Sequence, residues 1–414
     1  MLEEFFTLPA ILRGHRGGLL GPYLDSFTAK LVCLGYPRQT VRLQCCGIRD
    51  LGLWLQRQDL GVVDLSDELV SEYLEDRRRR ARFRRSGGAI VRLFVDHLQR
   101  QGVAATPRGV REESALEQLV RRYTAHLEVQ RGVVPRTVDI YVPFVRRFLA
   151  ERFGGGPLCF QAIATRDVSG FVLRWAHSQS PGRAKLMVTA LRSFFRFLLA
   201  QGEIEVDLAA AVPSVPDWRQ STVPKYLSKE QVERVLQACD RSTSTGRRNY
   251  AVLVLLARLG LRAGEVVALE LDDIDWRSGQ IKVHGKGSSH DQMPLLPDVG
   301  KALAIYLRRD RPRCSTRRVF VRTRAPYRGF AGSAAVTTIV SRALGRAGLE
   351  PPLRGAHLLR HSLATAMLGA GASMAEIGQV LRHRSPATTE IYAKVDFHAL
   401  HDLVQPWPIA EGAR

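Results

Sequence analysis

The chain has 414 residues, enough for two or three domains, and 45% of them are hydrophobic, as in ordinary globular proteins. Its net charge of +21 indicates a polyanionic partner, and nucleic acid is favoured over a membrane because no hydrophobic anchor accompanies the charge. The longest apolar run, residues 250–261, is too short to span a bilayer. Glu3 and Glu4 stand where a signal peptide carries bases, so we expect a cytoplasmic, nucleoid-associated protein.

The cysteines argue against a disulfide scaffold or a zinc site. None forms a CxxC pair, so we expect buried free thiols. The six are Cys33, Cys45, Cys46, Cys159, Cys239 and Cys314.

Residues 1–105 and 112–203 look like two copies of one helical unit. Each contains a Pro-Arg pair followed by a Thr-Val step within a few residues, at Thr40 and Thr137, then apolar residues at helical spacing and a glycine near the end. The offset between the copies is 97 residues at the front and 100 at the back. We therefore expect two helical modules, the first a duplicate of the second or an arm domain of similar fold.

Basic side chains in both modules are candidates for DNA contact. Seven arginines occupy nine positions from residue 77 to residue 85, and this one-signed run favours phosphate contact over an ordinary solvated face. Three further cations lie between apolar residues of the second module. The candidates are Arg77, Arg78, Arg79, Arg80, Arg82, Arg84 and Arg85, with Arg183, Lys185 and Arg192.

A linker, residues 204–226, separates the helical modules from a third domain. Two prolines and no hydrophobic periodicity predict an extended segment. Ser228 and Gln231 then form a capping box that starts a helix. We expect a domain over 227–400, followed by a short tail over 401–414.

The third domain begins around a helix that is apolar nearly all round, residues 250–260, and should therefore be buried. Arg262 and Glu265 follow it, and Glu265 either orients Arg262 or caps a helix. Residues 280–284 and 292–296 read as two strands joined by the turn 285–291, which carries Lys286 between two glycines.

Near the C-terminus, 36 residues contain His357, Arg360, His383 and Tyr392. His357 and Arg360 share one face of a helix, and Ser385 followed by Pro386 predicts a helix that runs past Tyr392. Arginine binds phosphate oxygens as a fork, histidine donates hydrogen bonds or protons, and tyrosine can be a covalent nucleophile. These side chains together suit chemistry on a phosphate.

The motif His-x-x-Arg-His, then Leu-x-His, then a tyrosine nine residues later, resembles the tyrosine recombinases of the phage integrase family. The resemblance covers roughly residues 112–400. It implies a mainly α fold with a small antiparallel β-sheet: helical N-terminal DNA-binding domains, the second a core-binding domain, and a mixed α/β catalytic domain. One departure is Arg382, where the family often has glycine; it alters the local turn or adds a phosphate contact.

The resemblance implies a catalytic set: Arg262, Lys286, His357, Arg360, His383 and the nucleophile Tyr392, with Glu265 behind Arg262. The arginines would hold the scissile DNA phosphate while Tyr392 forms a covalent 3′-phosphotyrosyl link. His357 would act as base or donor, His383 as a donor, and Lys286 would protonate the leaving 5′-oxygen. Lys282 is the competing lysine. No cofactor or metal is implied.

The resemblance further implies double-stranded DNA as partner and a homotetramer on two duplexes, integrating, excising or transposing a mobile element. A type IB topoisomerase is the alternative within this chemistry, and a catalytically silent DNA-binding regulator is the alternative outside it. A zinc site at His357 and His361 is disfavoured because Leu358 stands where the HExxH pattern needs glutamate.

Overall fold

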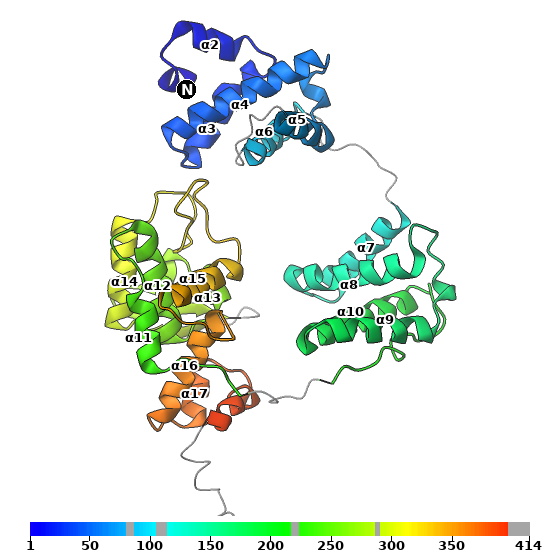
Figure 1. Ribbon diagram of the computed structural model, residues 1–414, viewed down its shortest axis with the longest axis vertical. Helices are drawn as coiled ribbons and strands as arrows, with labels where there is room; N and C mark the ends of the chain where they lie inside the picture. The colour runs from blue at the N-terminus through cyan, green and yellow to red at the C-terminus, as the bar shows by residue number, and fades with distance from the viewer. Residues whose placement is uncertain (80–86, 105–113, 217–222, 286–289, 396–414) are drawn as a thin grey trace, which may run out of the picture. The chain divides into compact units, whose positions relative to one another are not determined.

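The structure, a computed structural model, describes residues 1–79, 87–104, 114–216, 223–285 and 290–395 (Figure 1). The chain divides into two compact units, residues 1–106 with 222–414, and residues 107–221. Buried apolar side chains form one cluster within residues 2–104, one within 119–212 and two within 227–395. Within these ranges the fold is mostly helical with one small antiparallel sheet, as the sequence predicted. No helix in them is long and apolar enough to cross a membrane.

The first cluster is enclosed by helices whose apolar residues face inward. Phe27 and Phe94 meet edge to face at its centre, with ring centroids 4.9 Å apart. A 3₁₀ turn begins where the Asp64 carboxylate accepts the Gly61 N–H at 2.8 Å. The elements are α1 (Leu2–Phe5), α2 (Pro9–Arg16), α3 (Gly21–Cys33), α4 (Arg38–Arg57), η1 (Val62–Asp64), α5 (Asp67–Arg79) and α6 (Gly87–Arg100).

The second cluster is enclosed in a similar way. The Ser114 hydroxyl caps its first helix by accepting the Glu117 N–H at 3.3 Å. Tyr123 and Phe194 meet edge to face, with ring centroids 5.3 Å apart. The elements are α7 (Ala115–Ala125), the π-helical turn η2 (His126–Gln130), α8 (Pro135–Phe153), η3 (Phe160–Ala162), α9 (Thr165–Ser178) and α10 (Pro181–Ala200).

The two helical modules share an order of elements. Each contains a helix pair, a 3₁₀ turn and a second helix pair: α3, α4, η1, α5, α6 and α7, α8, η3, α9, α10. The first module adds α1 and α2 before this series, and in the second η2 lies between α7 and α8. The aromatic pair lies between the first and last of these helices in both. These correspondences support the predicted duplication, which stays a prediction.

The extended linker starts later than the predicted residue 204, because the first part of the segment packs on the second module. Ile204, Leu208 and Val212 are buried in the second cluster. Arg192 of α10 donates to the Val212 carbonyl at 2.8 Å and to the Ser214 hydroxyl at 2.9 Å. The apolar side chains and this arginine therefore hold the first part of the segment against the helices.

The third part of the chain is built around α12, whose side chains from residue 248 onward are mostly buried, as the apolar composition predicted. Ser228 and Gln231 form the predicted capping box at the start of α11. The helices are α11 (Lys229–Gln237), α12 (Ser244–Leu259), α13 (Ala263–Ala268), α14 (Pro297–Arg309), α15 (Ser333–Arg346), α16 (Ala356–Gly369) and α17 (Met374–Val380). The 3₁₀ helices are η4 (Leu271–Asp273), η5 (Pro386–Thr388) and η6 (Glu390–Val395).

A three-stranded sheet, ordered β1-β2-β3, lies beside these helices. Its strands are β1 (Ile274–Asp275), β2 (Gln280–His284) and β3 (His290–Pro294). The last strand begins two residues earlier than predicted because the antiparallel ladder pairs His284 with His290. The turn between β2 and β3 is correspondingly shorter.

Gly260 ends α12 in the left-handed conformation, with φ of 58°. A Cβ there would lie 2.7 Å from Leu381 and 3.1 Å from Leu363. Gly348, after α15, has φ of 64°, and a Cβ there would meet no atom within 4 Å. Gly348→Ala should therefore lower the free energy of unfolding by about 1 kcal/mol because of its backbone conformation. Gly260→Ala should lower it by about 1–3 kcal/mol more because of overpacking. Urea unfolding followed by circular dichroism measures both; equal losses would contradict the packing argument.

Candidate active site

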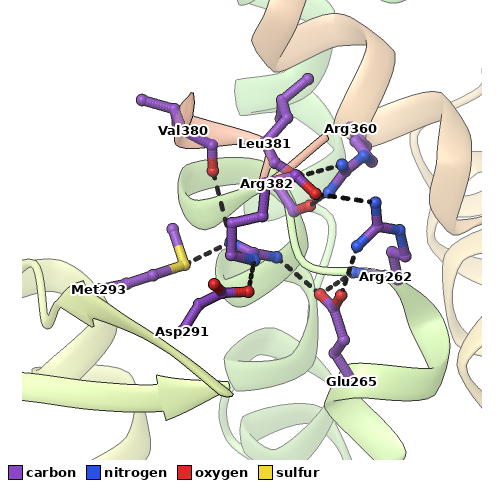
Figure 2. Close-up of polar contacts among 9 residues, drawn as sticks. Arg262, Glu265, Asp291, Met293, Arg360, Val380, Leu381 and Arg382 are labelled. Atoms are coloured by element: carbon purple, nitrogen blue, oxygen red, sulfur yellow. Dashed lines mark hydrogen bonds and ion pairs between the residues drawn. The ribbon is translucent and has the colours of Figure 1, made fainter. Parts of the chain in front are cut away.

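Arg262 stands at the start of α13, and Glu265 holds it there. The Glu265 carboxylate accepts the Arg262 backbone N–H at 2.8 Å and the Arg262 Nη1 at 2.7 Å (Figure 2). Both interpretations of Glu265 are therefore observed, because it caps the helix and also orients the arginine. The Glu265 side chain is 5% exposed, whereas Arg262 is 38% exposed.

Arg360 projects from α16 into the protein interior, where 3% of it is exposed. Its guanidinium donates to the carbonyls of Gly260 and Leu381, which follow α12 and α17. Burial and the nearby charges of Arg262 and Arg382 lower the pKa of Arg360 to about 10. The side chain is thus a cation at neutral pH, fixed by two backbone segments.

His361 contacts the candidate nucleophile. Its Nδ1 lies 2.9 Å from the Tyr392 hydroxyl, and its ring centroid lies 6.3 Å from that of His357, one turn earlier on α16. The sequence suggests His361 only as a metal ligand, four residues after His357. Its signal in the sequence was the histidine directly after Arg360, but a contact across 31 residues cannot be read from spacing.

Tyr392 is 1% exposed and lies on a 3₁₀ helix, η6. The predicted continuous helix from Ser385 past Tyr392 is wrong: the Ser385 side chain makes no cap hydrogen bond, and two short 3₁₀ helices meet at Thr389. The Thr389 hydroxyl is 2.7 Å from Nδ1 of His383. Such local side-chain bonds compete with regular helix, and here they bring the His383 and Tyr392 rings parallel, 6.5 Å apart.

Burial sets the protonation states of these rings. It lowers the pKa of His361 and of His383 to about 4 each, with neighbouring imidazole and guanidinium groups adding to the effect. It lowers the pKa of His357 as well and raises that of Tyr392. At neutral pH the imidazoles are therefore uncharged, and the phenol is protonated.

A cavity of about 890 Å³ opens beside these residues. Arg262, Arg382 and His383 line it, together with Gly285 at the end of β2. Lys286, the next residue, lies outside the described residues. Lys282, the competing lysine, is exposed on β2 and pairs with Gln292 of β3.

The comparisons with known proteins agree with this architecture. The model of the phage integrase family matches residues 225–399, and that of the phage integrase N-terminal SAM-like domain matches 120–202. Putative integrase/recombinase y4rA of Sinorhizobium fredii is 43% identical over 94% of this chain and 95% of its own length. Tyrosine recombinase XerD of Mycobacterium tuberculosis is 33% identical over 68% of this chain and 94% of its own. The chain belongs to the tyrosine recombinases of the phage integrase family.

Solved structures of the same fold include DNA complexes. XerH recombinase bound to palindromic difH has a TM-score of 0.55 and 21% identity, over 70% of this chain and 84% of that one. A lambda integrase tetramer bound to a Holliday junction has a TM-score of 0.51 and 18% identity, over 79% and 90%. Both confirm the predicted fold class. Members of the family are enzymes that cut and rejoin DNA at specific sites, so this chain is a recombinase of that class.

The predicted DNA contacts of the recombinase have varied surroundings. Arg77 pairs with Asp50 at 3.8 Å and lies over the Tyr73 ring, and Arg79 pairs with Glu75 at 3.9 Å. Arg192 is engaged with the segment after α10, so its guanidinium has a structural contact that the sequence did not indicate. Arg78, Arg183 and Lys185 are exposed. Arg80, Arg82, Arg84 and Arg85 lie outside the described residues.

The half-buried His361 and His383 make the stability of the recombinase depend on pH. The unfolded chain binds protons at these imidazoles near pH 6.5, whereas folded His361 and His383 bind them at about 4. Between these values the unfolded state holds more protons, so the melting temperature should fall as pH drops from 6.5 to 4. The variant with both His361→Gln and His383→Gln should show a shallower fall.

Thermal scans at successive pH values measure this dependence. His177→Gln, at an exposed histidine of α9, is the matched control and should keep the wild-type slope. A double variant with the wild-type slope would show that the two imidazoles are not the source.

Proposed function

We propose that Tyr392 is the nucleophile of site-specific DNA recombination, supported by Arg262, His357, Arg360, His383 and Lys286. One observation carries the proposal: the Tyr392 hydroxyl is paired with a neutral imidazole beside Arg360, and the Tyr392 ring lies 6.5 Å from that of His383, which lines the cavity with Arg262. The partner is double-stranded DNA, a polyanion that matches the charge of +21.

The proposed reaction transfers one phosphodiester bond to the enzyme. The Tyr392 Oη–phosphorus bond forms, the bond from phosphorus to the 5′-oxygen breaks, and a 3′-phosphotyrosyl link and a 5′-hydroxyl result. Arg262 and Arg360 neutralise charge on the non-bridging oxygens in the transition state. A 5′-hydroxyl from the partner duplex then reverses the attack, so the reaction needs no external energy source.

Two protons move in this step. The phenolic proton passes to a neutral imidazole, either His357, which the family resemblance implies, or His361, which lies 2.9 Å from the hydroxyl. The leaving 5′-oxygen receives a proton from Lys286. His383 donates a hydrogen bond to a phosphate oxygen.

Exchange of two duplexes requires four strand cleavages, and each chain supplies one candidate nucleophile. We therefore propose a homotetramer on two duplexes, with the helical modules and their arginines on the DNA backbone. The biological role we propose is integration, excision or transposition of a mobile element. A type IB topoisomerase would reseal its own strand, so the products formed on DNA with two sites distinguish the alternatives.

Tyr392→Phe removes the nucleophilic oxygen and leaves the ring in place. We expect it to form no covalent adduct while still binding DNA. Incubation with fragmented genomic DNA of the source organism, followed by denaturing capture of protein-linked DNA and sequencing, measures adducts and identifies the site. Tyr226→Phe, at an exposed tyrosine, is the control and should form adducts normally. Adducts from Tyr392→Phe would disprove the assignment.

Lys286→Ala tests the proton donor. Loss of a positioned acid should slow cleavage of normal DNA by a factor of ~10²–10⁴. Sulfur at the bridging 5′ position should restore the rate, because a thiolate leaves without protonation. The same substitution should not rescue Tyr392→Phe. Lys282→Ala is the matched control and should cleave both substrates at the wild-type rate; rescue of Lys282→Ala in place of Lys286→Ala would reverse the assignment.

A further inference from the structure

Arg382 occupies a backbone position that favours glycine. It directly precedes His383, and its φ of 55° lies in the left-handed region. This conformation is unfavourable for a side chain with a Cβ, so contacts elsewhere must offset its cost. The Arg382 side chain is nevertheless 8% exposed, which is unusual for an arginine at a turn.

The buried side chain of Arg382 joins three segments that are distant in sequence. Its Nη2 donates to Oε2 of Glu265 in α13 at 2.7 Å (Figure 2). Its Nε lies 3.8 Å from the Asp291 carboxylate of β3, and its Nη1 contacts the sulfur of Met293 in the same strand. The guanidinium thus lies between α13, the hairpin strand β3 and the turn after α17.

These contacts close a ring around Glu265. One carboxylate oxygen accepts Arg262 Nη1, and the other accepts both the Arg262 N–H and Arg382 Nη2. Arg262 Nη2 in turn donates to the Arg382 carbonyl at 3.3 Å. Glu265 is therefore held by two guanidinium groups, and removal of either one leaves its buried carboxylate with fewer donors.

We propose that Arg382 is a positioning residue for phosphate recognition. It fixes Glu265, and through Glu265 the Arg262 guanidinium, and it ties β3 to the same point. Although Arg382 borders the cavity, both of its Nη groups contact protein atoms and its side chain is 8% exposed, which favours this role over direct contact with a DNA phosphate. The inference rests on the proposed function, because it assigns Arg382 to act through Arg262.

Arg382→Gly tests this role while removing the unfavourable backbone strain. The full-length chain would be assayed in single-turnover cleavage of the duplex recovered with the wild-type protein. Loss of an outer-shell partner should slow cleavage by about 10–100-fold. Arg382→Lys keeps the charge and loses the fork, so its rate should fall between those of the wild type and the glycine variant. Arg317→Gln, which removes an exposed ion pair with Asp272, is the matched control and should cleave at the wild-type rate.

A substrate with a methylphosphonate at the scissile position distinguishes a loss of Arg262 positioning from a general loss of structure. This substrate lacks the negative charge that Arg262 neutralises. On this substrate both Arg262→Ala and Arg382→Gly should therefore lose less cleavage rate, relative to wild type, than they lose on normal DNA. The double variant should be no more than about twofold slower than Arg262→Ala, since residues that act as one unit are not additive.

Several results would overturn the proposal. Wild-type cleavage by a folded Arg382→Gly, or an equal loss on both substrates, would leave Arg382 without a positioning role. An unchanged rate in the bound complex, with weaker binding and a salt slope reduced by about one, would make it a direct phosphate contact. If Arg382→Gly fails to fold by circular dichroism, the lysine variant decides by the same comparison. Wild-type cleavage by Arg262→Ala would instead contradict the proposed function.

Discussion

The buried carboxylate of Glu265 pairs with two guanidinium groups, those of Arg262 and Arg382. Arg262 and Arg382 donate to it from opposite sides, and Arg360 lies close enough for both of them to lower its pKa. Like charges repel strongly where the effective dielectric constant is low. Without this carboxylate the arginines would separate, and α13, β3 and the turn after α17 would lose their common point of attachment.

The same arrangement leaves an excess of positive charge around Arg360. Arg360 bonds to two carbonyl oxygens, which satisfy its donors without cancelling its charge. A buried cation of this kind is costly in the free protein and is compensated when an anion enters. Under the proposed function this anion is a DNA phosphodiester, which would offset that electrostatic cost on binding, most of all where charge accumulates during the reaction.

The phenol of Tyr392, the proposed nucleophile, and the imidazoles near it are uncharged at neutral pH, unlike the arginines. Tyr392 is buried, and its hydroxyl is satisfied by His361, whose pKa is lowered by the same burial. A neutral imidazole beside a protonated phenol can accept a proton, whereas an imidazolium could not. The site therefore combines arginines, which stay charged because their pKa values are high, with imidazole and phenol groups that burial keeps neutral.

The sequence by itself determined the family, the order of the catalytic candidates and the local helix signals. The motif from His357 to Tyr392, the apolar helix before Arg262 and the capping box at Ser228 are all short-range patterns, and α11 and α12 form where they predict. The tertiary structure decided what is long-range. The Arg382–Glu265 ion pair spans 117 residues, and the contact between His361 and Tyr392 spans 31.

The 3₁₀ turns around Tyr392 and the role of Arg192 in holding the segment after α10 depended on such contacts in the same way. Propensity and spacing describe which side chains share a face of one element. They do not describe which element packs opposite, and at this site it is the opposite element that sets charge, hydrogen bonding and burial.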